Sequence, residues 1–285
     1  MLRYKSLSRL WMRRGQSAVL NAFLLLISTV AMAPLLYMLS VSFQGMPQIL
    51  KGAGIVPQPP TLEAYAFVFG KMPFFLYLKN TMIISIGVMI GAFLSNTLGA
   101  YGFARFRFPG REVLLSILLS SLMLPGTVRM VPTFLLFQQF GWVNTFLPFI
   151  VPAHFGSAFF IFMLRQFFRS LPDDLFDAAK MDGANELTVL VRVVLPLSKP
   201  AVATMLIFCA QGSWNDFLGP LIYLRDAKLR TLALGLWIIR SEPQGIPSWN
   251  NMMAVAVLLV LPIIILFALF QRYFVEGLVL SGLKG

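Results

Sequence analysis

The sequence predicts an all-α membrane protein with six transmembrane helices. Hydrophobic residues make up 58% of the 285 residues and charged residues only 12%, whereas about 25% of residues are charged in an ordinary soluble domain. The mean hydropathy of +0.79 agrees with an apolar environment. The apolar residues also fall into six runs of about the length that a bilayer-crossing helix requires.

Each run can cross a hydrocarbon core about 30 Å thick, because about 20 helical residues span that distance. The first run follows five basic residues and contains Ala31-Met-Ala33, so it resembles a signal peptide. The apolar stretch nevertheless continues past this box, and Pro34 occupies the position after the potential cut, so we interpret it as a retained first helix. The predicted spans are 18–41, 80–103, 112–134, 145–164, 201–224 and 252–271.

The basic residues set the orientation of these spans. Fifteen of the 23 Lys and Arg residues lie on the side that contains both termini, and eight lie on the other side. By the positive-inside rule, the tails 1–17 and 273–285 are cytoplasmic and flank a transmembrane domain over 18–272. The outer segments 42–79 and 225–251 contain turn residues and are expected to be loops, with one short helix over 62–69. No segment between spans is long enough for a soluble domain.

Several functions lack the residues they need. The chain has one cysteine, Cys209, and one histidine, His154, so neither a disulfide framework nor a metal site is expected. It has no GxxxxGK[ST] loop and should bind no nucleotide itself. The net charge of +12 falls in short clusters between apolar runs, which argues against a nucleic-acid partner. A membrane enzyme also finds little support, because the sequence contains no nucleophile elbow or paired catalytic carboxylates.

A polar segment over 171–200 interrupts the chain between the fourth and fifth spans. Pro172 should stop the preceding helix, and Asp173 or Asp174 can cap a new one. Gly183 suits a left-handed turn into a second helix, which Pro196 and Pro200 should end. In the first helix Leu175, Phe176 and Ala179 should share one side, and apolar residues recur at helical spacing in the second. A solvated loop and a helix pair that binds a partner both fit this pattern.

The residues of this segment carry a family resemblance. Asp177-Ala-Ala-Lys-Met-Asp-Gly-Ala184, followed by Val193-Val-Leu-Pro196, resembles the EAA loop of ABC importer permeases, with Asp177 where Glu is usual and Val193 where Ile is usual. Further matching pieces place the chain closest to the sugar-transporter branch. They are Ala100–Gly110 (AYGFARFRFPG), Leu124–Gly126 (LPG), Gly141–Thr145 (GWVNT), Leu171–Asp174 (LPDD), Trp214–Pro220 (WNDFLGP) and Gln271–Gly277 (QRYFVEG).

The resemblance implies the ABC type I importer permease fold, with a coupling helix in the 171–200 loop. It implies a transport subunit rather than an enzyme, in the bacterial inner membrane, with a homologous permease, two ATPase subunits and an extracytoplasmic solute-binding protein as partners. ATP and Mg would bind the ATPase subunits. The solute would be a sugar, or alternatively a polyol or glycerol phosphate. The implied ATPase-coupling residues are Asp177, Ala178, Ala179, Asp182, Gly183, Ala184, Leu195 and Pro196.

Polar residues within the spans suggest a solute path. Asp216 lies roughly 22 Å along the fifth span and, with Trp214, Asn215 and Gln211, could line such a path. Asp216 could equally reach outer water or cap a broken helix before Gly219-Pro220. An ion-coupled carrier that uses Asp216 and His154 is a further alternative, although His154 fits a packed or interfacial residue better. The small residues Gly87, Gly91, Ser95 and Gly99 recur every four positions and predict close helix packing.

Overall fold

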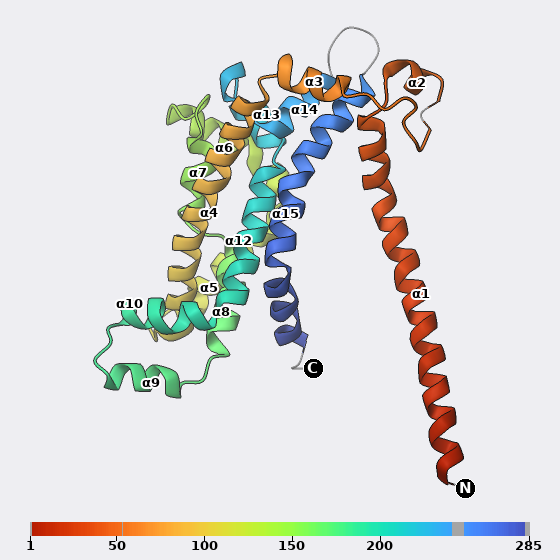
Figure 1. Ribbon diagram of the computed structural model, residues 1–285. Coiled ribbons are helices and arrows are strands. Elements are labelled where there is room, and N and C mark those ends of the chain that lie inside the picture. The colour runs from red at the N-terminus through yellow and green to blue at the C-terminus, as the bar shows by residue number, and fades with distance from the viewer. Residues whose placement is uncertain (1, 53, 241–247, 283–285) are drawn as a thin grey trace. The chain divides into compact units, whose positions relative to one another are not determined.

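The computed structural model describes residues 2–52, 54–240 and 248–282, and side chains for 19–52, 54–238 and 248–271. These residues form helices, turns and loops, and no β-strand occurs among them (Figure 1). The chain divides into two compact units, Met1–Met72 with Ile239–Leu258, and Pro73–Ile238 with Leu259–Gly285. Four of the described helices are long and apolar enough to cross a membrane, or six if each of two bent helix pairs is one span.

The first unit contains α1 (Leu2–Ser42), α2 (Met46–Leu50), α3 (Glu63–Gly70) and the start of α15 (Trp249–Gly282). The span-length part of α1 is Val19–Ser42, which coincides closely with the first predicted span, 18–41. The expected tail is itself helical from Leu2 onward and continuous with that span. Side-chain hydrogen bonds hold the segment after α1 to the end of that helix. The hydroxyls of Ser42 and Tyr65 lie 2.9 Å apart, and the Gln44 amide donates to the carbonyl of Gly54.

The second unit is built on α4 (Phe74–Arg105), which packs against α7 (Leu147–Ala153), α8 (Ala158–Arg169) and α12 (Lys199–Trp214). At 1.5 Å per residue, the 32 residues of α4 extend about 48 Å, beyond a hydrocarbon core of about 30 Å. One end of α4 therefore lies outside the apolar layer. The core around it contains the fully buried side chains of Leu164, Phe168, Val194 and Met205.

The third predicted span is broken. Its first part is α5 (Arg111–Ser120) with the 3₁₀ turn η1 (Ser121–Met123), and α6 (Gly126–Gln139) continues at 100° to it. The break falls at Leu124 and Pro125, because a residue before proline is disfavoured in helical conformation and proline has no N–H to donate. Leu124 is 54% exposed in this chain.

The other spans also differ from the prediction at their ends. The fourth, Leu147–Arg169, is interrupted at Gly156, whose φ is 84°. The fifth runs only to Trp214, and a short helix, α13 (Leu218–Tyr223), follows it. The outer segment after it was expected to be a loop but contains η3 (Ala227–Leu229) and α14 (Leu232–Arg240), since Leu232 and Leu234 are apolar enough to be buried.

The stripe of small residues on α4 is a packing face, as the sequence predicts. Gly87 lies under Ile150 of α7, where an added Cβ would come within 2.9 Å of the Ile150 side chain. Gly91 lies under the ring of His154, whose Nδ1 is 2.9 Å from the carbonyl oxygen of Ile150. His154 is therefore packed against α4, and its ring forms no ion pair with any acid in the described part of the chain.

Candidate functional site

The polar segment forms the short helix α9 (Asp174–Met181) and a tight turn. Gly183 has φ 77°, the left-handed conformation that the sequence predicts for it. The N–H of Ala184 returns to the carbonyl of Ala179, which closes the turn. The next helix, α10 (Glu186–Val189), begins at Asn185, whose side chain accepts from the N–H of Thr188.

After α10 the helix widens into the π-helical turn η2 (Leu190–Val194) and ends with α11 (Leu195–Leu197). Pro196 lies within α11 and does not end it. The chain bends by 84° before α12, with Ser198 at the junction. The break therefore falls between the two prolines that the sequence marks as helix ends.

Four of the six predicted coupling residues on α9 and its turn form an outward face, and Ala179 and Ala184 pack against the buried core. Asp177, Ala178, Asp182 and Gly183 are exposed, and Ala179 and Ala184 are half-buried. Their side chains are short, so the backbone of α9 is open to a partner. The inward side is carried by Phe176, which is buried. Leu175 does not share that side and remains 39% exposed, which corrects the expected grouping.

The remaining two predicted coupling residues lie elsewhere. Leu195 and Pro196 belong to α11, beyond the π-helical turn, and are not part of the α9 face. Leu195 packs in part against the buried core, whereas Pro196 is exposed.

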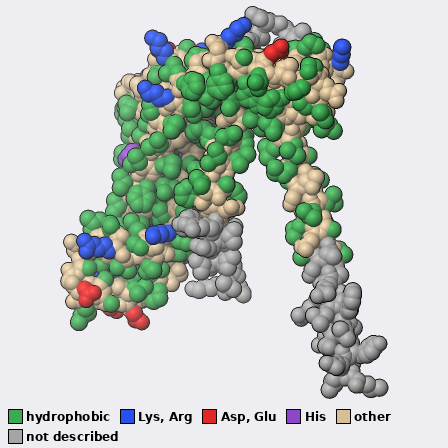
Figure 2. Space-filling model, viewed as in Figure 1, with side chains coloured by type: hydrophobic (Ala, Val, Ile, Leu, Met, Phe, Trp, Pro, Cys, Tyr) green, Lys and Arg blue, Asp and Glu red, His purple; other side chains and the backbone are tan. Residues whose placement is uncertain are grey.

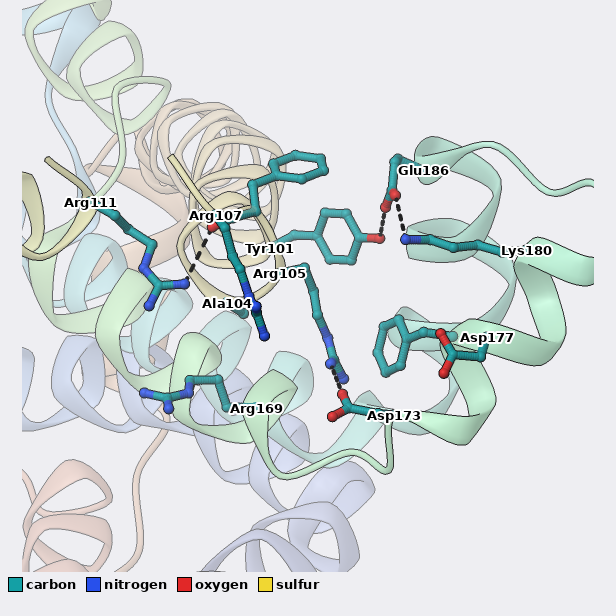
Figure 3. Close-up of a pocket in the computed structure, with 12 residues that line it drawn as sticks. Tyr101, Ala104, Arg105, Arg107, Arg111, Arg169, Asp173, Asp177, Lys180 and Glu186 are labelled. Atoms are coloured by element: carbon teal, nitrogen blue, oxygen red, sulfur yellow. Dashed lines mark hydrogen bonds and ion pairs between the residues drawn. The ribbon is translucent and has the colours of Figure 1, made fainter. Parts of the chain in front are cut away.

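Arg105, the last residue of α4, joins α4 to the base of α9 (Figure 3). Its guanidinium donates to Asp173 at 2.5 Å and to the carbonyls of Phe168 and Leu171 at 3.2 Å each. The same group lies 3.2 Å from the centre of the Phe176 ring. Asp173 does not cap α9 with its side chain, contrary to one of the two expectations, because its carboxylate pairs with Arg105 instead.

A second connection joins α4 to the turn after α9. The hydroxyl of Tyr101 donates to Glu186 at 2.5 Å, and the ammonium of Lys180 lies 3.2 Å from the other oxygen of that carboxylate. Helix α9 is thus held at both ends by residues one turn apart on α4. Tyr101 and Arg105 belong to the matching motif over 100–110, but the sequence indicates no role for them, because their partners are 85 and 68 residues away.

The residues proposed for a solute path divide between two hollows. Asp216 lies in a groove of roughly 500 Å³, and its Oδ1 accepts from the N–H of Gly219 at 3.0 Å, at the start of α13. This bond agrees with the capping alternative for Asp216, whose carboxylate also lines the groove. Gln211 lines a separate apolar hollow of roughly 330 Å³ beside α15. The Asp216 groove also contains the aromatic residues Phe137, Phe149, Phe160, Phe208 and Tyr223.

The other two path candidates are placed differently. Trp214 is buried, and its indole N–H donates to the carbonyl of Leu259 in α15 at 2.9 Å, so its polar group is already used within the chain. Asn215 is exposed at the end of α12. No cluster of three potential metal ligands occurs within the described ranges.

Comparison with known proteins places this arrangement in a family. A family model described as the binding-protein-dependent transport system inner membrane component matches residues 84–279. The chain is 33% identical over 282 residues to the arabinooligosaccharides transport system permease protein of Halalkalibacterium halodurans, covering 96% of this chain and 100% of the relative. It is 35% identical over 207 residues to the sn-glycerol-3-phosphate transport system permease protein of Pectobacterium atrosepticum, covering 73% of each.

A solved structure shares the fold. The structure of a bacterial ABC transporter involved in the import of the acidic polysaccharide alginate matches with a TM-score of 0.81 and 25% identity, covering 90% of this chain and 96% of that one. The family match covers more than half of the chain, and the first relative is similar over nearly its whole length. The chain therefore belongs to the family of binding-protein-dependent transport inner membrane components, the permease subunits of ABC importers.

Proposed function

We propose that this permease forms half of a translocation path for a sugar or sugar-like solute, and that α9 with its turn receives the movement of an ATPase subunit. The observation that carries the proposal is the attachment of α9 to α4. The outward face of α9 is open and has short side chains, whereas its inner side is held by Arg105 and Tyr101.

This attachment suits transmission of force. A partner that pushes on a helix held only by its two loops would bend the loops and leave the spans in place. Here the push acts on Phe176, which is buried against the Arg105 guanidinium, and on Glu186, which is bonded to Tyr101. Both contacts lead into α4, the helix against which α7, α8 and α12 pack. Rigid-body movement of α9 would thus reach the centre of the second unit.

The complete transporter, in this proposal, contains a homologous permease, two ATPase subunits that bind ATP and Mg, and an extracytoplasmic solute-binding protein. The family description, which names binding-protein dependence, supports the last of these. The excess of Lys and Arg on one side supports an inner-membrane orientation with both termini in the cytoplasm. On that orientation α9 lies on the cytoplasmic side, where an ATPase can reach it.

The groove at Asp216 supports a sugar as solute. Phe137, Phe149 and Tyr223 offer aromatic faces, and Asp216 and Ser213 offer polar groups, a combination that binds hydroxyl-rich molecules. A polyol or glycerol phosphate is the alternative, because a permease named for sn-glycerol-3-phosphate is among the relatives. The carboxylate of Asp216 would repel a phosphate, which favours the neutral solute.

The test uses the reconstituted complex in liposomes, with solute uptake and ATP hydrolysis measured together. Asp177→Lys should abolish uptake driven by ATP, because it reverses a charge on the exposed face of α9. Glu63→Lys is the matched control, since Glu63 is an exposed acid at the start of α3. Equal uptake per ATP in Asp177→Lys and the control would refute the coupling role. Solute accumulation on an ion gradient without ATP would instead establish an ion-coupled carrier.

A further inference from the structure

A charged cavity of roughly 580 Å³ lies beside α9, where three apolar helices have their ends. Helix α4 ends at Arg105, α8 ends at Arg169, and α5 begins at Arg111, while Arg107 lies in the link between α4 and α5. Figure 3 shows Arg107, Arg111 and Arg169 on the side of the cavity away from Lys180 and Glu186. We refer to Arg107, Arg111 and Arg169 as the arginine wall.

The carboxylates near this cavity are mostly engaged by other groups. Asp173 pairs with Arg105, and Glu186 with Tyr101 and Lys180. Asp177 also lines the cavity, but its side chain is exposed on α9.

One carboxylate, that of Glu112, forms an ion pair with the arginine wall. Glu112 pairs with Arg111 at 2.7 Å and lies 3.6 Å from the buried Arg165, and Arg169 is within its electrostatic range. Arg165 is further held by the carbonyl of Phe103. The side chains of Arg107 and Arg169 form no hydrogen bond or ion pair with any residue in the described part of the chain. The wall therefore carries more positive than negative charge.

The position of the wall determines which anion can reach it. Phe74–Arg105 and Leu147–Arg169 are span candidates by length and composition, and Arg111–Met123 is the first half of a bent pair that passes the same test together with Gly126–Gln139. Their shared end is where the apolar layer gives way to lipid headgroups. Figure 2 shows Lys and Arg side chains gathered towards the ends of the second unit, with hydrophobic side chains over its middle. Basic pockets between spans at this depth are a known setting for phosphate-bearing lipid headgroups.

We propose that the arginine wall binds a phosphate group, presented either by an anionic phospholipid headgroup or by free phosphate. Guanidinium groups bind phosphate through paired N–H donors, and Arg107 and Arg169 have such donors unused. The cavity volume exceeds that of a phosphate alone and accommodates a glycerol-linked headgroup. The site is separate from the solute groove and does not depend on which solute is carried.

The test measures thermal unfolding of the detergent-purified permease complex titrated with phosphatidylglycerol, phosphatidylcholine or inorganic phosphate. The test variant is Arg107→Gln with Arg169→Gln. The matched control is Arg129→Gln with Arg225→Gln, two exposed arginines outside the cavity. The test variant should need at least about tenfold more phosphatidylglycerol than the wild type for the same rise in unfolding temperature. The reason is that the variant lacks two charged groups that donate hydrogen bonds to the phosphate. The control pair should behave as the wild type.

The titration also separates the two sources of phosphate. Stabilisation by phosphatidylglycerol but not by millimolar inorganic phosphate identifies a lipid site, and stabilisation by inorganic phosphate identifies a site for the free ion. Equal effects of phosphatidylglycerol and phosphatidylcholine, with none from phosphate, would overturn the proposal. So would an unchanged titration in the test variant. If that variant fails to assemble, the titrations are repeated with single Arg107→Gln, and unchanged responses to both phosphatidylglycerol and inorganic phosphate refute the site.

Discussion

Replacement of Arg105 by Ala should release α9 from α4. The guanidinium makes four contacts with the base of α9 and the end of α8. Its ion pair with Asp173 contributes only about 0.5 kcal/mol, because the Asp173 side chain is 84% exposed and solvent screens the pair. Each carbonyl bond, at 3.2 Å, contributes about 1 kcal/mol, and the stacking on Phe176 about 1 to 2 kcal/mol.

The Phe168 bond holds α8, so the contacts with Asp173, Leu171 and Phe176 stabilise the attached position of α9 by about 3 kcal/mol, which corresponds to roughly a hundredfold change in the local opening equilibrium. Amide hydrogen exchange over residues 174–182 measures that equilibrium directly. In Arg105→Ala the amide exchange over 174–182 should accelerate by up to that factor. Uptake per ATP hydrolysed should fall in liposomes. Arg105→Lys keeps the charge but loses the planar group that contacts Phe176 and both carbonyls, so its exchange should be intermediate.

The matched control is Arg192→Ala, which removes an exposed arginine of the π-helical turn whose side chain has no hydrogen bond or ion pair among the described residues. Exchange in this variant should match the wild type. If exchange over 174–182 in Arg105→Ala stays within about threefold of the wild type, the attachment does not depend on this side chain. The reasoning from distances and burial would then be wrong.

Two glycine substitutions test other parts of the fold, with Gly102→Ala as a shared control, because a Cβ at Gly102 meets nothing within 4 Å and its φ is not positive. In Gly183→Ala the added Cβ meets no other atom, but the residue must keep a left-handed φ of 77°, which costs about 1 to 2 kcal/mol for a residue with a Cβ. Amide exchange in the turn should therefore rise, and ATP-coupled uptake should fall. Unchanged exchange would show that the turn adapts. Gly87→Ala brings a Cβ to 2.9 Å from Ile150 and should cost about 1 to 3 kcal/mol, seen as a lower melting temperature in detergent. A melting temperature equal to that of the control would mean that α7 shifts freely on α4.

The features that the sequence predicted correctly depend on local signals. Apolar runs of about 20 residues located the long helices, because length and composition alone decide whether a helix can span a bilayer. The left-handed turn at Gly183 followed from a glycine between two helical patterns. The packing role of Gly87 and Gly91 followed from their spacing on one helix face.

The features that escaped prediction depend on residues distant in the chain. Asp173 looked like a helix cap because capping is local, but its partner Arg105 lies 68 positions earlier. Trp214 was a candidate for the solute path because an aromatic ring can stack on a sugar, but its indole N–H bonds to Leu259, 45 positions later. The end of the fifth span was set too late, because the apolar run continues into α13 after the chain has already turned.

The broken third span has a consequence for how the protein is made. Arg111–Met123 covers only about 20 Å at 1.5 Å per residue, so the irregular backbone at Leu124 falls short of the far membrane surface. Lipid cannot satisfy unpaired backbone groups at that depth, and such a break must face water or another protein. In the proposed assembly, a subunit synthesised without its companion permease would present this break to the bilayer. Cells that produce the subunits in unequal amounts should therefore degrade the surplus, and a stable solitary form of the chain is not expected.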